Sequence, residues 1–162
     1  MPEFRLLGKK PTRQGFGEGL VVLGERYDNV VVLGGDITES VMTSLFRDRF
    51  PDRFFSIGVA EQNATTIAVG LALSGKIPFF ASYGAFCAFR NADQLRISVC
   101  YNEVNVKIGG GHAGVSVGPD GATHQALEEI AIIRTLPKMT LVVPCDYTET
   151  KKATIAIGEM WG

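Results

Sequence analysis

Glu61 is the first residue of this chain whose position suggests chemistry. It follows an apolar stretch and a glycine, and it opens a segment, 61–74, that is expected to be helical and has no further charge before Lys76. A helix that is apolar on nearly all sides is usually buried, and a carboxylate entering such a core needs a partner or a function. The structural alternative is that Glu61 is stabilised by the positive end of the helix dipole.

A second group of candidate residues surrounds a glycine-rich loop expected over 109–123. The loop carries His112 and Asp120, and His124 follows it directly. Imidazole and carboxylate groups can transfer protons near neutral pH, and glycines let a loop bring its backbone close to a ligand. The two histidines are 12 residues apart, which fits neither a metalloprotease helix nor a zinc finger. Catalysis and a purely structural role therefore both stay open, and no metal site is expected in this chain.

Helices and strands are expected to alternate along the chain. The predicted helices cover 13–28, 40–49, 61–74, 86–102, 125–135 and 146–157, and the predicted strands cover 30–33, 54–59, 77–81, 104–108 and 140–144. Continuously apolar strands that alternate with helices form a parallel sheet covered on both faces. The sequence therefore predicts a three-layer α/β/α domain with a mainly parallel sheet, whose ligands would bind at the carboxyl ends of the strands.

Length and composition are typical of one soluble globular domain, which we expect to span residues 1–162. A net charge of −1 without a basic run gives no reason to expect nucleic-acid binding. The first residues lack the apolar region of a signal peptide, and no stretch of about 20 apolar residues could cross a membrane. Three widely spaced cysteines fit no disulfide framework, so a cytoplasmic location is expected.

The end of the chain is unusual for a parallel sheet. The helix predicted at 146–157 is followed by only five residues, whereas a right-handed crossover should return the chain to another parallel strand. We therefore expect that the domain is truncated at its C-terminus and that its last strand is missing.

Three blocks of sequence occur together at a spacing that is typical of one family. They are Gly58-Val59-Ala60-Glu61-Gln62, the block from Ser82 to Phe89, and the block from His112 to Gln125, which contains Asp-Gly-x-Thr-His-Gln. In these blocks the chain resembles the pyrimidine-binding domain of transketolase, above all the form of transketolase that is split into two polypeptides. Gly-x-Ala-Glu-Gln alone is shared across thiamine-diphosphate enzymes, and its combination with the third block makes the resemblance specific.

The resemblance implies that the cofactor is thiamine diphosphate and that Glu61 contacts the far ring nitrogen of its aminopyrimidine. Burial among apolar neighbours would favour the protonated carboxyl, so that a shared proton is available there. Tyr83, Phe86 and Phe89 would form the wall against which the pyrimidine stacks, and Ile37 would press between the two cofactor rings. For the aromatic residues and for Ile37, ordinary core packing is the structural alternative.

The resemblance also assigns a sugar-binding side of the site. His112 would lie beside the reacting carbon, Asp120 would bind a substrate hydroxyl, and His124 would bind the donor and move protons. Arg13 and Ser40 would hold the sugar phosphate, the arginine through charge-assisted hydrogen bonds. An arginine that opens a surface helix is usually only solvated, which is the alternative for Arg13.

One part of the family pattern is missing from this chain. The motif that binds the diphosphate and Mg²⁺ (or Ca²⁺) is Gly-Asp-Gly followed by Asn-Asn, and neither half of it is present. The resemblance therefore implies a separate diphosphate-binding transketolase subunit that holds the metal. A homodimer or a heterotetramer is expected, and this chain alone should be inactive.

The full enzyme would transfer a two-carbon ketol unit from a ketose phosphate to an aldose phosphate, in the pentose phosphate pathway. The nearest alternative is the related synthase that makes deoxyxylulose phosphate from pyruvate and glyceraldehyde 3-phosphate, although His112 favours transketolase because an arginine is expected near that place in the synthase. A third possibility is a non-catalytic relative that serves as an interaction or regulatory module.

Overall fold

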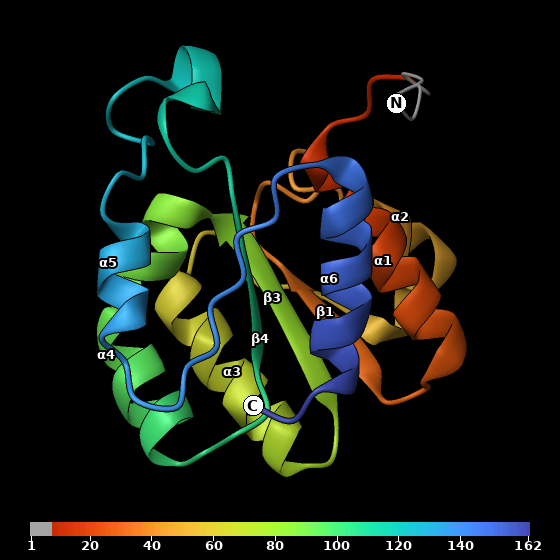
Figure 1. Ribbon diagram of the computed structural model, residues 1–162. Helices are drawn as coiled ribbons and strands as arrows, with labels where there is room; N and C mark the ends of the chain where they lie inside the picture. Colours follow the sequence, from red (N-terminus) through yellow and green to blue (C-terminus); the bar gives the residue numbers. More distant parts are fainter. Residues whose placement is uncertain (1–7) are drawn as a thin grey trace, which may run out of the picture.

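In the computed structural model, which describes residues 8–162, four parallel strands form one sheet between two layers of helices (Figure 1). The strands are β1 (Val30–Gly34), β2 (Phe54–Ser56), β3 (Ile77–Tyr83) and β4 (Lys107–Gly111), in the order β2-β1-β3-β4. Leu33 on β1 pairs with Phe55 on β2 and with Phe80 on β3. The predicted three-layer α/β/α architecture is confirmed.

The helices divide between the two faces of the sheet (Figure 1). One face is covered by α1 (Thr12–Arg26), α2 (Ser44–Arg49) and α6 (Tyr147–Glu159), and the other by α3 (Glu61–Leu73), α4 (Ala92–Gln94) and α5 (Glu129–Arg134). Short 3₁₀ turns lie at Pro51–Arg53 and Val115–Asp120, and π-helical turns flank α4 at Phe86–Arg90 and Leu95–Tyr101.

Each face of the sheet has its own apolar core, because successive strand residues point to opposite sides. On the α1 side, Val32 and Phe79 pack with Leu20, Leu23 and other buried residues. On the α3 side, the neighbouring strand residues Leu33 and Phe80 pack with alanines of α3 and with buried residues of the segment around α4.

The helices α1 and α6 meet through glycines. A Cβ at Gly15 would collide with the carbonyl oxygen of Tyr147, and a Cβ at Gly19 would lie 2.8 Å from the Cβ of Thr154. Since real Cβ atoms do not approach other atoms so closely, these positions must be glycine for the two backbones to pack at this distance. The seam draws together segments near the beginning and the end of the chain.

The strand predicted at 140–144 is wrong. In the described part of the chain the sheet has four strands, and this segment belongs to neither a strand nor a helix. Val142 and Val143 are exposed. Residues with branched side chains favour strands only where they can pack on a half-buried pleated surface, and this segment offers no such surface.

Several further boundaries differ from those predicted; the second strand ends at Ser56 rather than at 59, and the second helix begins at Ser44 rather than at 40. The helix at 86–102 is broken into π-helical and α-helical pieces around the buried Asn91; such π turns accommodate an additional residue. The fourth strand begins at Lys107 rather than at 104, because Val106 donates its backbone hydrogen bond locally to Val104 and not to a neighbouring strand. The helix at 125–135 begins only at Glu129, because Ala126 forms an antiparallel bridge with Gly114.

Candidate functional site

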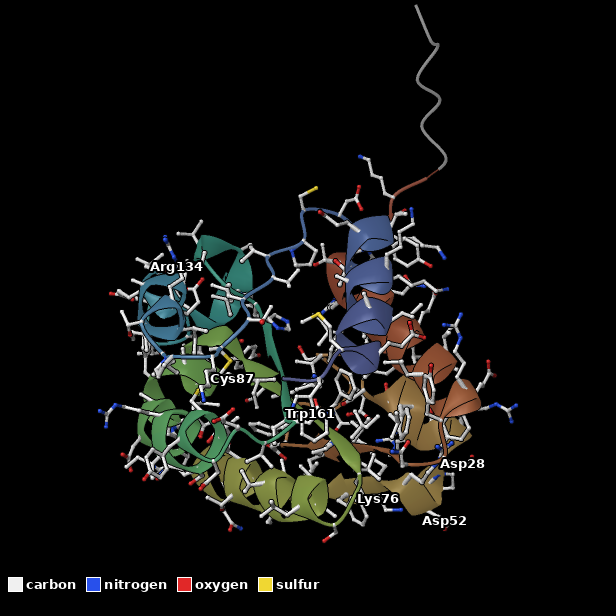
Figure 2. All side chains as sticks on the ribbon, turned by 60° about the horizontal axis from the view of Figure 1, so that its bottom comes forward. Asp28, Asp52, Lys76, Cys87, Arg134 and Trp161 are labelled. Atoms are coloured by element: carbon white, nitrogen blue, oxygen red, sulfur yellow. The ribbon has the colours of Figure 1, made fainter. Side chains whose placement is uncertain are left out.

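The candidate residues gather at the carboxyl edge of the sheet, as the parallel topology requires. Glu61 follows β2, Tyr83 ends β3, and His112 follows β4 directly. Figure 2 shows the opposite edge, where the charged residues Asp28, Asp52 and Lys76 precede β1, β2 and β3. The residues that could do chemistry therefore lie at one edge of the sheet, and the opposite edge carries exposed charged residues.

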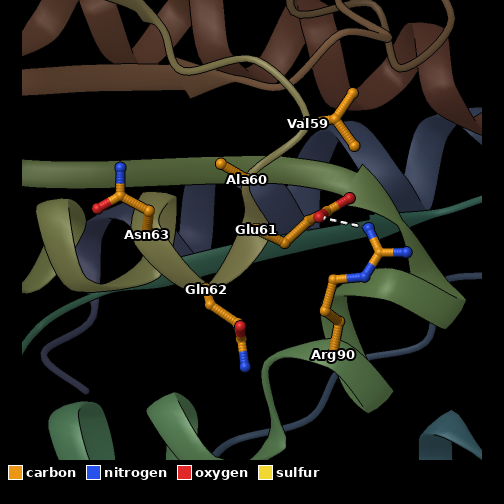
Figure 3. Close-up of a pocket in the computed structure, with 6 residues that line it drawn as sticks. All are labelled: Val59, Ala60, Glu61, Gln62, Asn63 and Arg90. Atoms are coloured by element: carbon orange, nitrogen blue, oxygen red, sulfur yellow. Dashed lines mark hydrogen bonds and ion pairs between the residues drawn. The ribbon is translucent and has the colours of Figure 1, made fainter.

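Glu61 is buried at the first position of α3 and forms an ion pair. Its Oε2 atom accepts a hydrogen bond of 2.6 Å from Nη1 of Arg90. The pair lines a hollow of about 400 Å³ whose other walls are Val59, Ala60, Gln62 and Asn63 (Figure 3). The partner that a buried carboxylate needs is thus Arg90, a residue for which no role was predicted from the sequence.

Arg90 makes a second contact on the same side of the molecule. Its guanidinium carbon lies 4.3 Å from the centre of the Phe86 ring, within the range of a cation–π interaction. The separation of four residues between Phe86 and Arg90 in a predicted helix was the one sequence signal that could have indicated this pair. The choice of Glu61 as the other partner depends on the tertiary fold.

Tyr83 lies at the centre of an aromatic cluster. Its ring centre is 4.7 Å from that of His112, 5.3 Å from that of His124 and 5.7 Å from that of Phe86, and all three contacts are edge-to-face. Its hydroxyl donates a hydrogen bond of 2.7 Å to Oδ2 of Asp120. This hydrogen bond, assisted by burial, raises the pKa of Tyr83 above its usual value.

His112 connects this cluster to the start of α1. Its Nε2 atom is 3.1 Å from Oγ of Ser40, and the carbonyl oxygen of Ser40 accepts a hydrogen bond of 3.2 Å from Nη1 of Arg13. Burial, followed by the nearby Arg13 guanidinium, lowers the pKa of His112 below its usual value, although Asp120 opposes the shift. A neutral imidazole is therefore favoured at this position.

The remaining predicted residues lie at the margins of this arrangement. Nδ1 of His124 is 2.9 Å from Oγ1 of Thr123, and the His124 ring centre is 5.2 Å from that of Phe86. Phe89 is exposed and lines a second hollow of about 510 Å³ together with Phe86 and Arg90. Ile37 is half-buried in the turn after β1, where its carbonyl accepts a hydrogen bond from the Val41 amide.

A model of the family described as "Transketolase, pyrimidine binding domain" matches residues 8–159. The chain belongs to this family. It is 46% identical to a "Putative transketolase C-terminal section" of Methanocaldococcus jannaschii, over 94% of this chain and 48% of that protein. It is 37% identical to human transketolase, over 94% of this chain and 24% of that protein.

Two solved structures of transketolases also match the chain. One, titled "Split gene transketolase, inactive beta4 tetramer", matches with a TM-score of 0.84 and 42% identity, over 96% of this chain and 50% of that one. Transketolase from Campylobacter jejuni also matches with a TM-score of 0.84, at 26% identity, over 96% of this chain and 25% of that one. The chain thus spans about half or a quarter of the length of the relatives described here.

Transketolases use thiamine diphosphate, and two contacts in this domain fit its aminopyrimidine. The Glu61 carboxylate and the Phe86 ring both touch the flat guanidinium of Arg90. The same two groups could therefore contact another flat group that has nitrogen atoms on its edge, one by a hydrogen bond and the other by stacking.

Residues 8–162 contain no group of three or more His, Cys, Asp or Glu side chains that could hold a metal ion. Within the same range, no helix has both the length and the apolar character needed to cross a membrane.

Proposed function

We propose that this transketolase pyrimidine-binding domain supplies one half of an active site that transfers a two-carbon ketol unit from a ketose phosphate to an aldose phosphate. The observation that carries the proposal is a continuous row of side chains along the carboxyl edge of the sheet. Glu61 and Phe86 share Arg90, while Tyr83 lies against both Phe86 and His124. A surface suited to a flat ring thus adjoins groups suited to moving protons.

When bound, thiamine diphosphate supplies the carbon nucleophile, and the residues of this domain prepare its pyrimidine end. Glu61 holds a proton at the far nitrogen of the aminopyrimidine, where a buried carboxyl has little competition from water. Tyr83 and Phe86 stack against the ring and exclude water, and Phe89 extends this wall. Ile37 presses on the cofactor from the turn after β1.

The sugar side of the site uses the second group of residues. His112 and His124 move protons at the donor carbonyl and hydroxyl groups, and Asp120 binds a hydroxyl while its other contact, Tyr83, fixes its direction. Arg13 and Ser40 hold the sugar phosphate. Their contacts with each other and with His112 support the idea that the phosphate and the reacting carbon are bound by adjoining residues.

The proposal includes a second polypeptide that binds the diphosphate and its Mg²⁺ or Ca²⁺ ion. Two findings support it: the chain lacks the Gly-Asp-Gly and Asn-Asn motif, and a similar split-gene transketolase structure is titled as an inactive tetramer. We propose that residues 1–162 form a single pyrimidine-binding domain, that the active assembly is a homodimer or a heterotetramer, and that it works in the cytoplasm.

The test is reconstitution with a candidate diphosphate-binding chain, thiamine diphosphate and Mg²⁺. We expect ketol transfer from xylulose 5-phosphate with the mixture and none with either chain alone. Glu61→Gln keeps the shape of the side chain but removes the acidic proton, so it should reduce turnover by about 10²- to 10⁴-fold without preventing assembly. Assembly is measured by gel filtration of the mixture.

Glu25→Gln is the matched control, because Glu25 is an exposed acid at the far end of α1. It should leave turnover unchanged. Turnover by this chain alone would contradict the need for a partner. Use of pyruvate as donor would indicate the deoxyxylulose-phosphate synthase reaction instead, and no turnover with either donor, despite stable assembly, would indicate a non-catalytic module.

A further inference from the structure

Arg90 occupies the place that the proposed function assigns to the aminopyrimidine. It is the last residue of the π-helical turn Phe86–Arg90, and its side chain reaches back toward the start of α3 (Figure 3). Its guanidinium carbon lies over the Phe86 ring, 4.3 Å from the ring centre, while Nη1 donates to Glu61 at 2.6 Å. These are a stacking contact and a carboxylate hydrogen bond, the two contacts proposed above for the cofactor ring.

A guanidinium and an aminopyrimidine have the chemistry in common that these contacts select. Both are flat and delocalised, both present edge nitrogen atoms that can share a proton with a carboxyl group, and both have a face that stacks on an aromatic ring. Because Glu61 and Phe86 each meet the same guanidinium, a pyrimidine cannot make both contacts until Arg90 has moved.

The exposure of the two partners indicates which of them can move. The Glu61 side chain is only 6% exposed, whereas that of Arg90 is 43% exposed. Arg90 also lines both hollows, the one beside Glu61 and the one beside Phe89. A rotation of its side chain would therefore carry the guanidinium toward solvent or into the second hollow, while the buried carboxylate stays in place.

We propose that Arg90 is an internal stand-in for the aminopyrimidine. In the empty domain it compensates the buried charge of Glu61 and covers Phe86, and it must leave both before the pyrimidine can bind. This inference rests on the proposed function, since it takes the Glu61 and Phe86 surface to be the pyrimidine site. Only molecules in which Arg90 has moved away can bind the ring, so the apparent affinity equals the intrinsic affinity multiplied by the fraction of such molecules.

The test is an NMR titration of thiamine, which carries the aminopyrimidine without the diphosphate, into the full chain. Arg90→Met keeps an unbranched apolar stem but removes the flat cation, and it should bind thiamine roughly five- to thirty-fold more tightly than the unchanged protein. Arg96→Met is the matched control, because Arg96 is exposed on the π-helical turn after α4, and it should not change the affinity. Equal or weaker binding by a folded Arg90→Met overturns the inference.

A second measurement uses the unchanged protein, in case Arg90→Met does not fold. The side-chain ¹⁵N–¹H resonances of Arg90 should shift toward those of a solvated arginine as thiamine is added, and unchanged resonances at saturation would overturn the inference. In Arg90→Ala, millimolar guanidinium chloride should weaken thiamine binding more than sodium chloride does, because the free ion can reoccupy the vacated position.

Glu61→Gln separates the failure of the inference from that of the proposed function. Thiamine binding that depends on Glu61 but not on Arg90 contradicts only the stand-in role. If neither the unchanged protein nor any Arg90 variant binds thiamine, and Glu61→Gln changes nothing, then both the pyrimidine site and the stand-in role are wrong.

Discussion

His112 adopts a backbone conformation that its side chain does not favour. Its φ of 55° lies in the left-handed region, which is uncommon for any residue that carries a Cβ. The Nδ1 atom of its ring is buried without a hydrogen-bond partner. Both features are costly for the fold and concentrate at functional sites, which suits a residue that we place beside the reacting carbon.

The lowered pKa of His112 predicts how stability changes with pH. The imidazole binds a proton less readily in the folded protein than at its usual pKa of 6.5, so the unfolded chain holds more protons near and below that pH. Folding stability should therefore fall as the pH falls from about 6.5 through the lower pKa of the folded state. Thermal unfolding between pH 7.5 and pH 5 measures this change.

His112→Asn is the variant to compare with the unchanged protein, since asparagine tolerates a positive φ. Its melting temperature should fall less over the same pH range than that of the unchanged protein. NMR can follow the imidazole directly, because the chain has only two histidines. Identical pH profiles for the two proteins, or a His112 resonance that titrates above pH 6.5, would contradict the prediction.

At the residue scale, the resemblance grouped side chains that the structure brings together, but it did not give the contacts between them. It assigned Tyr83, Phe86 and the two histidines to one site, and their side chains meet because the carboxyl ends of parallel strands share one edge. The Arg90 contacts were not predicted, since residues 61 and 90 come from different helical segments. Nor could the sequence indicate that Tyr83 bonds to Asp120, because that depends on the path of a glycine-rich loop.

At the element scale, the glycine seam between α1 and α6 makes a prediction of its own. Gly15→Ala places a methyl group against the backbone of α6, and overpacking of this kind costs about 1–3 kcal/mol. Gly70→Ala is the control: Gly70 is an exposed glycine of α3 with open space around it. That change should stabilise the protein by up to about 1 kcal/mol, because alanine is the better helix former.

Urea unfolding of the two variants measures both effects, and they should have opposite signs. If Gly15→Ala is as stable as the unchanged protein, then α1 and α6 can move apart far enough to accommodate the methyl group without a loss of folding stability.

Element types were more predictable than element boundaries, and the exceptions have physical causes. Each of the first four predicted strands overlaps a strand of the sheet, although β2 is short and partly exposed and β4 begins three residues later than predicted. The run at 140–144 has a similar composition, yet it forms no ladder with the outer strand β4, and composition alone does not reveal whether a run pairs. The breaks around α4 and before α5 reflect local hydrogen bonding that periodicity does not detect.

At the scale of the whole molecule, apolar side chains remain uncovered along the edge that carries the site. Val59 is 71% exposed and Val115 is 72% exposed, and they follow β2 and β4. These are the two outer strands of the sheet, so the two valines lie toward its two ends, and apolar residues exposed along one edge often mark an interaction surface. We expect this edge to be covered by the proposed diphosphate-binding chain.

Val59→Asp tests this expectation, because a charge at that position would be costly to bury in an interface. It should weaken co-assembly with the diphosphate-binding chain at least about tenfold, as measured by calorimetry of the two chains. Tyr101→Asp is the control, since Tyr101 is 82% exposed but precedes β4, at the opposite edge. If both changes weaken assembly equally, or neither does, the carboxyl edge is not the interface.

The seam between α1 and α6 also has a consequence for the order in which the protein folds. Glu18 and Lys151, which form an ion pair across the seam, are 133 residues apart in the chain. At ordinary rates of synthesis the ribosome needs roughly ten seconds to make that much chain, and throughout this time the glycine-lined side of α1 has nothing to pack against. A glycine-rich segment is a poor helix by itself, so α1 should stay loosely formed until α6 has emerged. Closure of this long-range contact would then be a late event, and its high contact order would slow folding.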